Sequence, residues 1–277
     1  MSKVDLHIHT TASDGRFTPV EIVQKAQENG LTVIAITDHD ALDGIVPALQ
    51  AAEAYPWLTI IAGVEINTDV PSGELHVLGY FIDYYNQELN DTLECLRSSR
   101  LERAKGMIDK LKKLGVYISF ERVKAIAGTG AVGRPHIAEA MLEKGYIKEY
   151  KEAFNKYIGH GGPAYVERDK ITPTEAVKLV LRAGGLPVLG HPLTFENPEA
   201  MILELKTVGL VGIEAYYANY TAEQVNQLLS LAKKYDLIAT GGSDYHGIDP
   251  TNETMMGAVE VPLESAERLM ALARHKC

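Results

Sequence analysis

The 277-residue chain is poor in cysteine, in long apolar runs and in positive charge. Its two cysteines, Cys95 and Cys277, are too few for a disulfide framework or a thiolate metal site, and they fit a reducing cytoplasm. No apolar run approaches the roughly 18 to 20 residues of a membrane-spanning helix. The N-terminal residues lack the basic and apolar regions of a signal peptide. We therefore expect a cytoplasmic protein without a membrane anchor.

The formal net charge is −10, and 46% of the residues are hydrophobic, so a large core can form. A protein that coats long duplex nucleic acid would need a basic surface, so no such partner is expected. A small anionic substrate remains compatible with the acidic balance, because bound metal ions can reverse the field locally.

Strand and helix patterns alternate at both ends of the chain. Apolar runs of the kind found in buried strands cover residues 4–9, 32–37, 58–62, 75–81, 186–189, 211–215 and 237–240. Capping boxes with proline at the first helical position begin helices at Thr18 and Thr172. Further helical patterns cover 43–55, 221–235 and 263–274, and another begins at Asn197. This alternation predicts an α/β fold with a parallel barrel.

The middle of the chain carries helical patterns only, at residues 93–114, 120–127, 136–143 and 148–157. We expect a small inserted helical subdomain over 93–163 that contributes to the substrate cleft. The barrel domain then consists of residues 1–92 and 164–277. The alternative is a series of ordinary crossover helices within one barrel.

Two histidines, His7 and His9, lie one residue apart in the first predicted strand, V-D-L-H-I-H. Residues i and i+2 of a strand point to the same face, so the two imidazoles lie side by side. A half-buried strand whose polar face carries two histidines would explain this stretch equally well by itself.

Six histidines and five acids lie at or near the ends of predicted strands. The histidines are His7, His9, His39, His76, His191 and His246, and the acids are Asp14, Asp38, Asp40, Glu65 and Asp244. His76 fits least well, because it comes early in its strand, whereas Glu65 is expected directly after the third strand. A parallel barrel gathers the carboxyl ends of its strands on one face, so we expect these side chains to converge there.

Neutral imidazole together with carboxylate is a ligand set for Mn, Fe or Zn rather than for Mg or Ca. Nine ligands drawn from these eleven side chains would exceed what one ion uses, since zinc typically takes four ligands. The sequence therefore predicts two or three divalent ions in one cleft.

Five short motifs occur in order along the chain: H-I-H, T-D-H-D, G-V-E, G-H-P and S-D-Y-H-G. Together they resemble the PHP (polymerase and histidinol phosphatase) family of metal-dependent phosphoesterases. The resemblance implies a distorted (β/α)7, TIM-like barrel with a trinuclear site. It places one ion on His7, His9, Glu65 and Asp244, a second on Glu65, His76 and His191, and a third on Asp14, His39 and His246.

The insert narrows this resemblance. Its motifs G-R-P-H-I-A, from Gly133, and G-P-A-Y-V, from Gly162, resemble the bacterial nucleotide-phosphatase branch of the family. That branch includes enzymes that remove the 3′-phosphate of nucleoside 3′,5′-bisphosphates and exoribonucleases that trim short RNA from the 5′ end. The resemblance implies a nucleotide or short oligoribonucleotide as substrate and attack of a metal-activated hydroxide on phosphorus.

Residues outside the ligand set have two readings each. Arg134 is expected to clamp a phosphate with help from His136, although Arg134-Pro135 also fits a plain helix start. Asp38 and Asp40 are expected to orient imidazoles, and helix capping by Asp40 is the alternative. The stretch 98–105 is interpreted as a solvated helix face, and a minor role in contacting a nucleotide is the alternative.

Three other functions stay open. An amidohydrolase also begins with H-x-H, but such enzymes usually bridge two metals with a carboxylated lysine, and no predicted strand here ends in lysine. A phosphatase for histidinol phosphate would need only a small site. A non-catalytic metal-binding scaffold is the third alternative, although a decayed site would be expected to lack some of the ligands.

Overall fold

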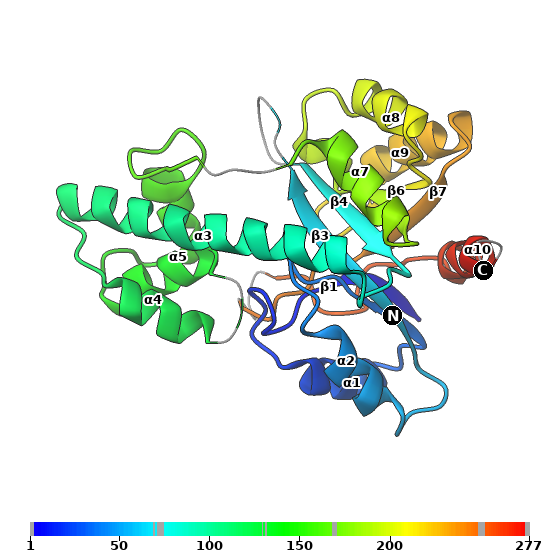
Figure 1. The fold of residues 1–277 in the computed structure, drawn as a ribbon, viewed down its shortest axis with the longest axis horizontal. Coiled ribbons are helices and arrows are strands. Elements are labelled where there is room, and N and C mark those ends of the chain that lie inside the picture. Colours follow the sequence, from blue (N-terminus) through cyan, green and yellow to red (C-terminus); the bar gives the residue numbers. More distant parts are fainter. Residues whose placement is uncertain are drawn as a thin grey trace.

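The computed structural model describes residues 3–68, 70, 75–128, 130, 132–167, 171–248 and 253–274. Within these residues, seven strands form one sheet in sequential order (Figure 1). The strands are β1 (Val4–Ile8), β2 (Val33–Ile36), β3 (Thr59–Thr68), β4 (Leu75–Tyr80), β5 (Leu186–Gly190), β6 (Gly212–Tyr217) and β7 (Ile238–Gly242). All seven predicted strands are therefore present.

The sheet closes on itself next to its first strand. Ile8 at the end of β1 bridges Tyr245, which follows β7, and the His9 amide donates a hydrogen bond to the Tyr245 carbonyl at 3.0 Å. The prediction of a distorted (β/α)7 barrel is confirmed. The expectation that every strand is parallel is wrong, because β4 pairs antiparallel with both β3 and β5.

The reversed direction of β4 explains the position of His76. The strand register pairs His76 with Asn67 near the end of β3 and with Gly190 at the end of β5. The beginning of β4 thus lies at the same end of the barrel as the carboxyl ends of its neighbours. β3 also runs on to Thr68, so Glu65 lies within this strand and not after it.

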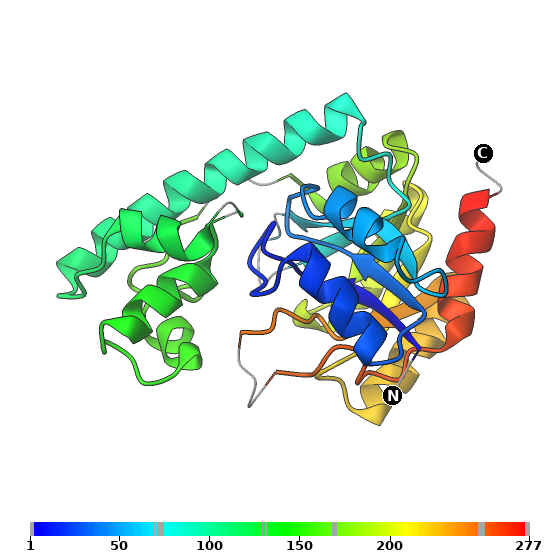
Figure 2. The same ribbon diagram turned by 90° about the horizontal axis from the view of Figure 1, so that it is seen from below.

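Helices cover the outside of the barrel (Figures 1 and 2). They are α1 (Pro19–Glu28), α2 (Ile45–Ala52), α7 (Pro173–Arg182), α8 (Pro198–Thr207), α9 (Ala222–Lys234) and α10 (Leu263–Arg274). The capping boxes at Thr18 and Thr172 are present as predicted. Ala266 and Leu269 of α10 pack against Val4 and Leu186, at the amino ends of β1 and β5, so α10 closes that end of the barrel.

The central helices form a second body beside the barrel, green in Figure 2. They are α3 (Gln87–Lys113), α4 (Phe120–Ala127), α5 (Arg134–Glu143) and α6 (Tyr150–Ala153), which continues as a π-helical turn, Phe154–Ile158. Leu93 and Leu96 of α3 pack into the barrel core, whereas Met107 and Leu111 pack into the core of the insert. The expected domain boundary between residues 92 and 93 thus falls inside one continuous helix.

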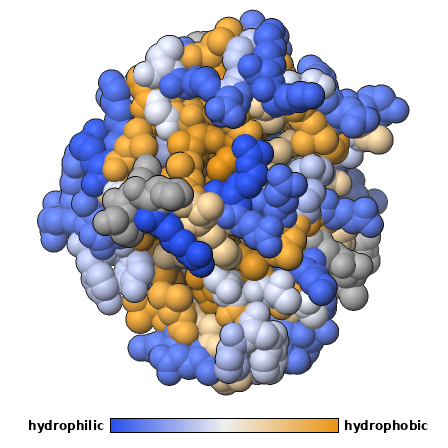
Figure 3. All heavy atoms as spheres, turned by 90° about the vertical axis from the view of Figure 1, so that its right-hand side faces the viewer, coloured by the Kyte–Doolittle hydropathy of each residue, from blue (hydrophilic) through white to orange (hydrophobic). Residues whose placement is uncertain are grey.

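The surface at the α10 end mixes hydrophobic and hydrophilic side chains in small patches (Figure 3). None of the described helices combines the length and apolar character needed to cross a membrane.

Tyr80 provides a test of how the strands are held around the barrel. Its buried hydroxyl donates to the Leu6 carbonyl at 3.0 Å, linking β4 to β1. Tyr80→Phe leaves that carbonyl without this donor and is expected to lower the free energy of unfolding by about 1 kcal/mol. Denaturant titration measures the change. Tyr85→Phe is the control, because Tyr85 is 75% exposed. Equal unfolding midpoints for both variants would contradict the prediction.

Candidate metal centre

Glu65 lies at the centre of a cluster that contains all nine predicted metal ligands. Its Oε2 atom is 3.1 Å from Nε2 of His7, 3.1 Å from Nε2 of His9 and 3.0 Å from Nδ1 of His39. Its Oε1 atom is 2.6 Å from Nδ1 of His76 and 3.0 Å from Nε2 of His191. One carboxylate on β3 therefore contacts five imidazoles from different segments of the barrel.

Two further acids complete the cluster. Asp244 Oδ1 lies 3.3 Å from His7 Nε2 and 3.1 Å from His9 Nε2. Asp14 Oδ1 lies 3.5 Å from His246 Nε2 and 3.8 Å from His9 Nδ1. Residues as far as 237 positions apart in the sequence, His7 and Asp244, thus meet at one end of the barrel.

The donor atoms fall into three groups that could each hold an ion. These are His7, His9, Glu65 and Asp244; His9, Asp14, His39 and His246; and His39, Glu65 and His76. The first group is the predicted one. The second group adds His9 to the predicted set of Asp14, His39 and His246. The third contains His39 and not the predicted His191, although Nε2 of His191 lies 3.0 Å from His76 and from Glu65.

Unsatisfied donor atoms test whether these residues fit a metal. Buried polar atoms in folded proteins nearly always have hydrogen-bond partners. Five buried cluster atoms have none: Nε2 of His7, Nε2 of His9, Oδ1 of Asp14, Oε2 of Glu65 and Oδ1 of Asp244. The atoms of His7, His9, Glu65 and Asp244 each lie 3.1–3.3 Å from two of the others without hydrogen-bond geometry. The Asp14 atom lies 3.5 Å from Nε2 of His246. Imidazole nitrogens and carboxylate oxygens that converge in this way fit divalent cations, so the residues present match a metal centre.

Burial and charge set the protonation of the cluster. Burial, the largest effect, lowers the pKa of His39 to about 3, so its ring is neutral and can offer a lone pair. Burial alone would raise the pKa of Glu65, but the rings of His39 and His7 overcome this and hold it well below its usual value. Asp14 and Asp244 have lowered pKa values for the same reason. The three carboxylates are therefore ionised.

Four imidazoles, those of His7, His9, His191 and His246, have raised pKa values instead. Burial lowers the pKa of His246, but Asp14 and Asp244 outweigh burial and raise it to about 10. The pKa of His7 is also raised well above its usual value, because Asp244 and Glu214 outweigh the effect of burial. In the metal-free fold the rings of His7 and His246 hold protons at neutral pH, where a metal ion would need their lone pairs.

Asp38 fixes the loop that follows β1. Its carboxylate accepts hydrogen bonds from the Thr10 amide at 2.7 Å, the Thr10 hydroxyl at 2.8 Å and the Ser13 hydroxyl at 2.7 Å. Ser13 in turn lies 3.5 Å from Nδ1 of His9. Asp38 thus holds the segment between His9 and Asp14 in place. None of these three hydrogen bonds joins it to an imidazole.

Asp40 connects the insert to the cluster. Its carboxylate accepts hydrogen bonds from the backbone amide of Asn67 at 3.1 Å and from Nε of Arg100 at 2.9 Å. The side-chain Nδ2 of Asn67 lies 3.0 Å from Nδ1 of His39. The helix that follows, α2, begins after Gly44 without a side-chain cap. The expected solvated face over 98–105 is wrong for Arg100, which is only 7% exposed because its side chain reaches Asp40.

Glu214 was not anticipated from the sequence. It is fully buried on β6, lies 2.9 Å from Nδ1 of His7 through Oε1, and accepts from the His191 amide at 2.7 Å through Oε2. A carboxylate behind a metal-binding imidazole fixes its orientation. The feature of the sequence that could have indicated this role is that Glu214 is the single acid in the apolar run 211–215.

Strained backbone also gathers at the cluster. Asp40, His191 and Asp244 have φ angles of 49°, 24° and 53°, a region that residues other than glycine rarely adopt. Such conformations persist only where the surrounding contacts hold them, and they are common at functional sites.

The two expected substrate residues lie at the start of α5. His136 is buried, accepts from the Gly133 amide at 2.9 Å through Nδ1, and lines a cavity of about 310 Å³ that also contacts Asp14. The Arg134 guanidinium lies over the Phe154 ring, 5.5 Å from its centroid. His136 thus borders the cluster, whereas Arg134 turns toward the insert.

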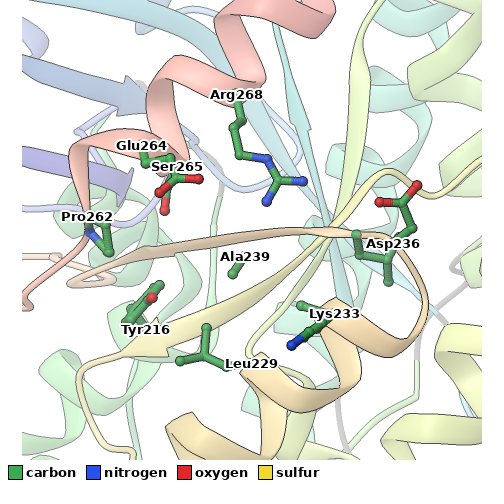
Figure 4. A pocket seen from close by; sticks show the side chains of 11 residues that line it. Tyr216, Leu229, Lys233, Asp236, Ala239, Pro262, Glu264, Ser265 and Arg268 are labelled. Atoms are coloured by element: carbon green, nitrogen blue, oxygen red, sulfur yellow. The ribbon is translucent and has the colours of Figure 1, made fainter.

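Another cavity, of about 350 Å³, lies between α9 and α10 on the outside of the barrel (Figure 4). Charges of both signs line it, among them Lys233, Asp236, Glu264 and Arg268. None of the cluster residues lines this cavity, so it is separate from the metal centre.

A barrel with converging histidines and carboxylates at one end defines a metal-dependent hydrolase. A family model described as the PHP domain matches residues 5–182, so the chain belongs to the PHP domain family. The chain is a metal-dependent phosphoesterase, as the sequence motifs predict.

Two relatives cover most of the chain. A 5′-3′ exoribonuclease from Haemophilus influenzae is 33% identical over 248 residues, which are 88% of this chain and 90% of the relative. A 3′,5′-nucleoside bisphosphate phosphatase from Chromobacterium violaceum is 30% identical over 251 residues, 89% of this chain and 88% of the relative.

Two solved structures have the same architecture. A protein from Bifidobacterium adolescentis described as a metal-dependent phosphoesterase has a TM-score of 0.89 at 28% identity, covering 97% of this chain and 95% of its own. A Chromobacterium violaceum protein described as an amidohydrolase, with bound sulfate and no metal, has a TM-score of 0.90 at 28% identity, covering 98% and 96%.

The role of Glu214 leads to a prediction on metal affinity. Glu214→Gln weakens the acceptor that orients His7, and it is expected to lower the affinity for Mn²⁺ about 10- to 100-fold. Equilibrium dialysis with metal analysis measures this loss. Glu264→Gln, on the exposed start of α10, is the matched control. Equal metal affinity in the two variants would argue against an orienting role for Glu214.

The raised pKa values of His7 and His246 predict that metal binding releases protons. Both rings are protonated in the metal-free fold at pH 7, so each ion that takes their lone pairs must displace a proton. The apparent affinity for Mn²⁺ should therefore rise from pH 6 to pH 8. Calorimetry in buffers of different ionisation enthalpy counts the protons, and His246→Asn should release fewer. A pH-independent affinity would contradict this assignment of protons.

Proposed function

We propose that the chain is a cytoplasmic phosphoesterase that removes the 3′-phosphate of nucleoside 3′,5′-bisphosphates and also trims short RNA from the 5′ end. The two activities are the same reaction on different substrates. In both, the bond between phosphorus and the 3′ oxygen of a nucleotide that carries a 5′-phosphate is hydrolysed. Water adds its oxygen to phosphorus, and the 3′ oxygen leaves and takes up a proton. The substrate classes named for the two relatives support this choice.

The observation that carries the proposal is the set of five buried donor atoms without hydrogen-bond partners around Glu65. We propose that two or three ions of Mn, Fe or Zn are held there by His7, His9, Asp14, His39, Glu65, His76, His191, Asp244 and His246. When bound, such ions supply Lewis acidity and lower the pKa of water. Asp38 and Asp40 hold the loops that carry His9, Asp14 and His39.

The cavity beside Asp14 suits a nucleoside. Its volume of about 310 Å³ is at the lower end of small-molecule sites. Apolar faces of Ile126, Tyr150 and Ile248 line it together with the Arg16 side chain. We propose that the base and ribose lie here, with His136 at the end nearest the phosphates and Arg134 beside it at the start of α5.

A substrate panel tests the proposal. Purified protein loaded with Mn²⁺ is assayed for phosphate release from 3′-phosphoadenosine 5′-phosphate, for mononucleotide release from 5′-phosphorylated RNA, and with histidinol phosphate and dihydroorotate. We expect the bisphosphate to have the highest kcat/KM. Glu65→Gln should reduce that value at least 100-fold, because the carboxylate shared by five imidazoles is lost.

The other arms of the panel decide between the alternatives. A clear preference for histidinol phosphate would indicate a small-substrate phosphatase. Ring opening of dihydroorotate without phosphate release would indicate an amidohydrolase. No turnover of any compound by a metal-loaded sample would leave a binding scaffold. Each of these results would overturn the proposed substrate.

A further inference from the structure

Tyr217 is the last residue of β6, and it lies beside the metal centre without being one of the nine proposed ligands. Its hydroxyl donates a hydrogen bond to Oδ2 of Asp244 at 2.8 Å. Its ring centroid is 5.5 Å from that of His191. One side chain thus contacts a proposed ligand through its hydroxyl and borders a second through its ring.

The two oxygens of Asp244 have different surroundings. Oδ2 accepts from Tyr217, whereas Oδ1 is buried and has no hydrogen-bond partner among the described residues. Oδ1 lies 3.3 Å from Nε2 of His7 and 3.1 Å from Nε2 of His9. A tyrosine hydroxyl is protonated at neutral pH and donates one hydrogen bond. Tyr217 therefore occupies Oδ2 and leaves Oδ1 as the oxygen that faces the imidazoles.

The backbone at Asp244 is strained and depends on such support. Its φ angle is 53°, and conformations of this kind persist only where neighbouring contacts hold them. The amide and the hydroxyl of Ser243 donate to the Asp5 carboxylate at 2.9 Å and 2.6 Å. Asp5 thus fixes the backbone that precedes Asp244, and Tyr217 fixes its side chain.

An irregularity in β6 directs Tyr217 toward the cluster. Between Glu214 and Tyr216, β6 advances two residues while its partner β7 advances one, so β6 holds one extra residue. Side chains alternate along a regular strand, so residues 214 and 217 would point to opposite faces. In the structure Glu214 contacts His7 and Tyr217 contacts Asp244. The extra residue therefore brings both side chains to the metal centre, as bulges next to functional sites often do.

We propose that Tyr217 is a positioning residue of the metal centre, whose hydroxyl holds Oδ2 of Asp244 so that Oδ1 faces the ion bound with His7 and His9. This inference rests on the metal centre of the proposed function and adds a residue outside its ligand set. Loss of the hydroxyl leaves the ring in place and lets the carboxylate turn.

The first experiment measures metal binding and not turnover. Equilibrium dialysis with metal analysis determines the affinity for Mn²⁺ of wild type, Tyr217→Phe and Tyr216→Phe. Tyr217→Phe should weaken the binding of at least one ion about 10- to 100-fold, as expected when the partner that orients a ligand is lost. Tyr216→Phe is the matched control, because this neighbouring side chain lines the cavity outside the barrel (Figure 4). It should bind Mn²⁺ like the wild type.

A spectrum separates positioning from a general loss of stability. The absorption bands of bound Co²⁺ depend on the geometry of its ligands. Co²⁺-loaded Tyr217→Phe should therefore have shifted bands, whereas Tyr216→Phe should match the wild type. Tyr217→Met, which fills the space without a hydroxyl donor, covers the case in which the phenylalanine variant fails to fold. It should show the same loss of affinity and a shifted spectrum.

A folded Tyr217 variant with the Mn²⁺ affinity and the Co²⁺ spectrum of the wild type would overturn the proposal. Turnover of 3′-phosphoadenosine 5′-phosphate is measured on the same samples. A wild type that binds Mn²⁺, loses affinity through Tyr217→Phe and yet hydrolyses no nucleotide would support this proposal and refute the proposed function alone. A wild type that binds no divalent ion would refute both.

Discussion

The structure depends on one desolvated carboxylate. Glu65 is almost fully buried, and burial of an unpaired charge is strongly unfavourable. Five imidazoles offset this cost by surrounding both of its oxygens. They come from β1, β4 and the segments that follow β2 and β5, so most of the barrel must close correctly for the carboxylate to be stable. Closure of the barrel and assembly of the site are therefore coupled, because the strands bring the imidazoles and the carboxylate together in the buried interior.

The reversal of β4 is part of this arrangement. In a fully parallel sheet the beginning of a strand lies at the closed end of the barrel, where α10 packs. Because β4 runs antiparallel, its second residue, His76, reaches Glu65 instead. The same pairing lets β3 continue to Thr68, so Glu65 and Asn67 are both placed by regular strand geometry. Only six residues separate β3 from β4 in the sequence, and antiparallel strands can be joined by so short a connection.

Local patterns in the sequence predicted most elements and all nine residues of the cluster, because strand ends and caps are marked by neighbouring residues. Thr18 with Glu21 is such a signal, as is His7 with His9. Strand direction and partners from distant segments leave no comparable mark. In the sequence, Glu214 is a single acid in an apolar strand, and its contact with His7 depends on the position of β6 in the fold. Arg100 matched an exposed helical face, since its partner Asp40 lies 60 residues away in the chain.

The long helix α3 links the insert to the barrel that carries the metal centre. Its first half packs into the barrel core through Leu93 and Leu96, and its second half carries the core of the insert through Met107 and Leu111. Arg100 lies between these halves and is held by Asp40. A rigid-body shift of the insert would have to bend α3 or break a buried ion pair, and loss of one partner from such a pair typically costs about 3 to 5 kcal/mol. The Arg100–Asp40 pair therefore restrains the insert and at the same time steadies the loop carrying His39.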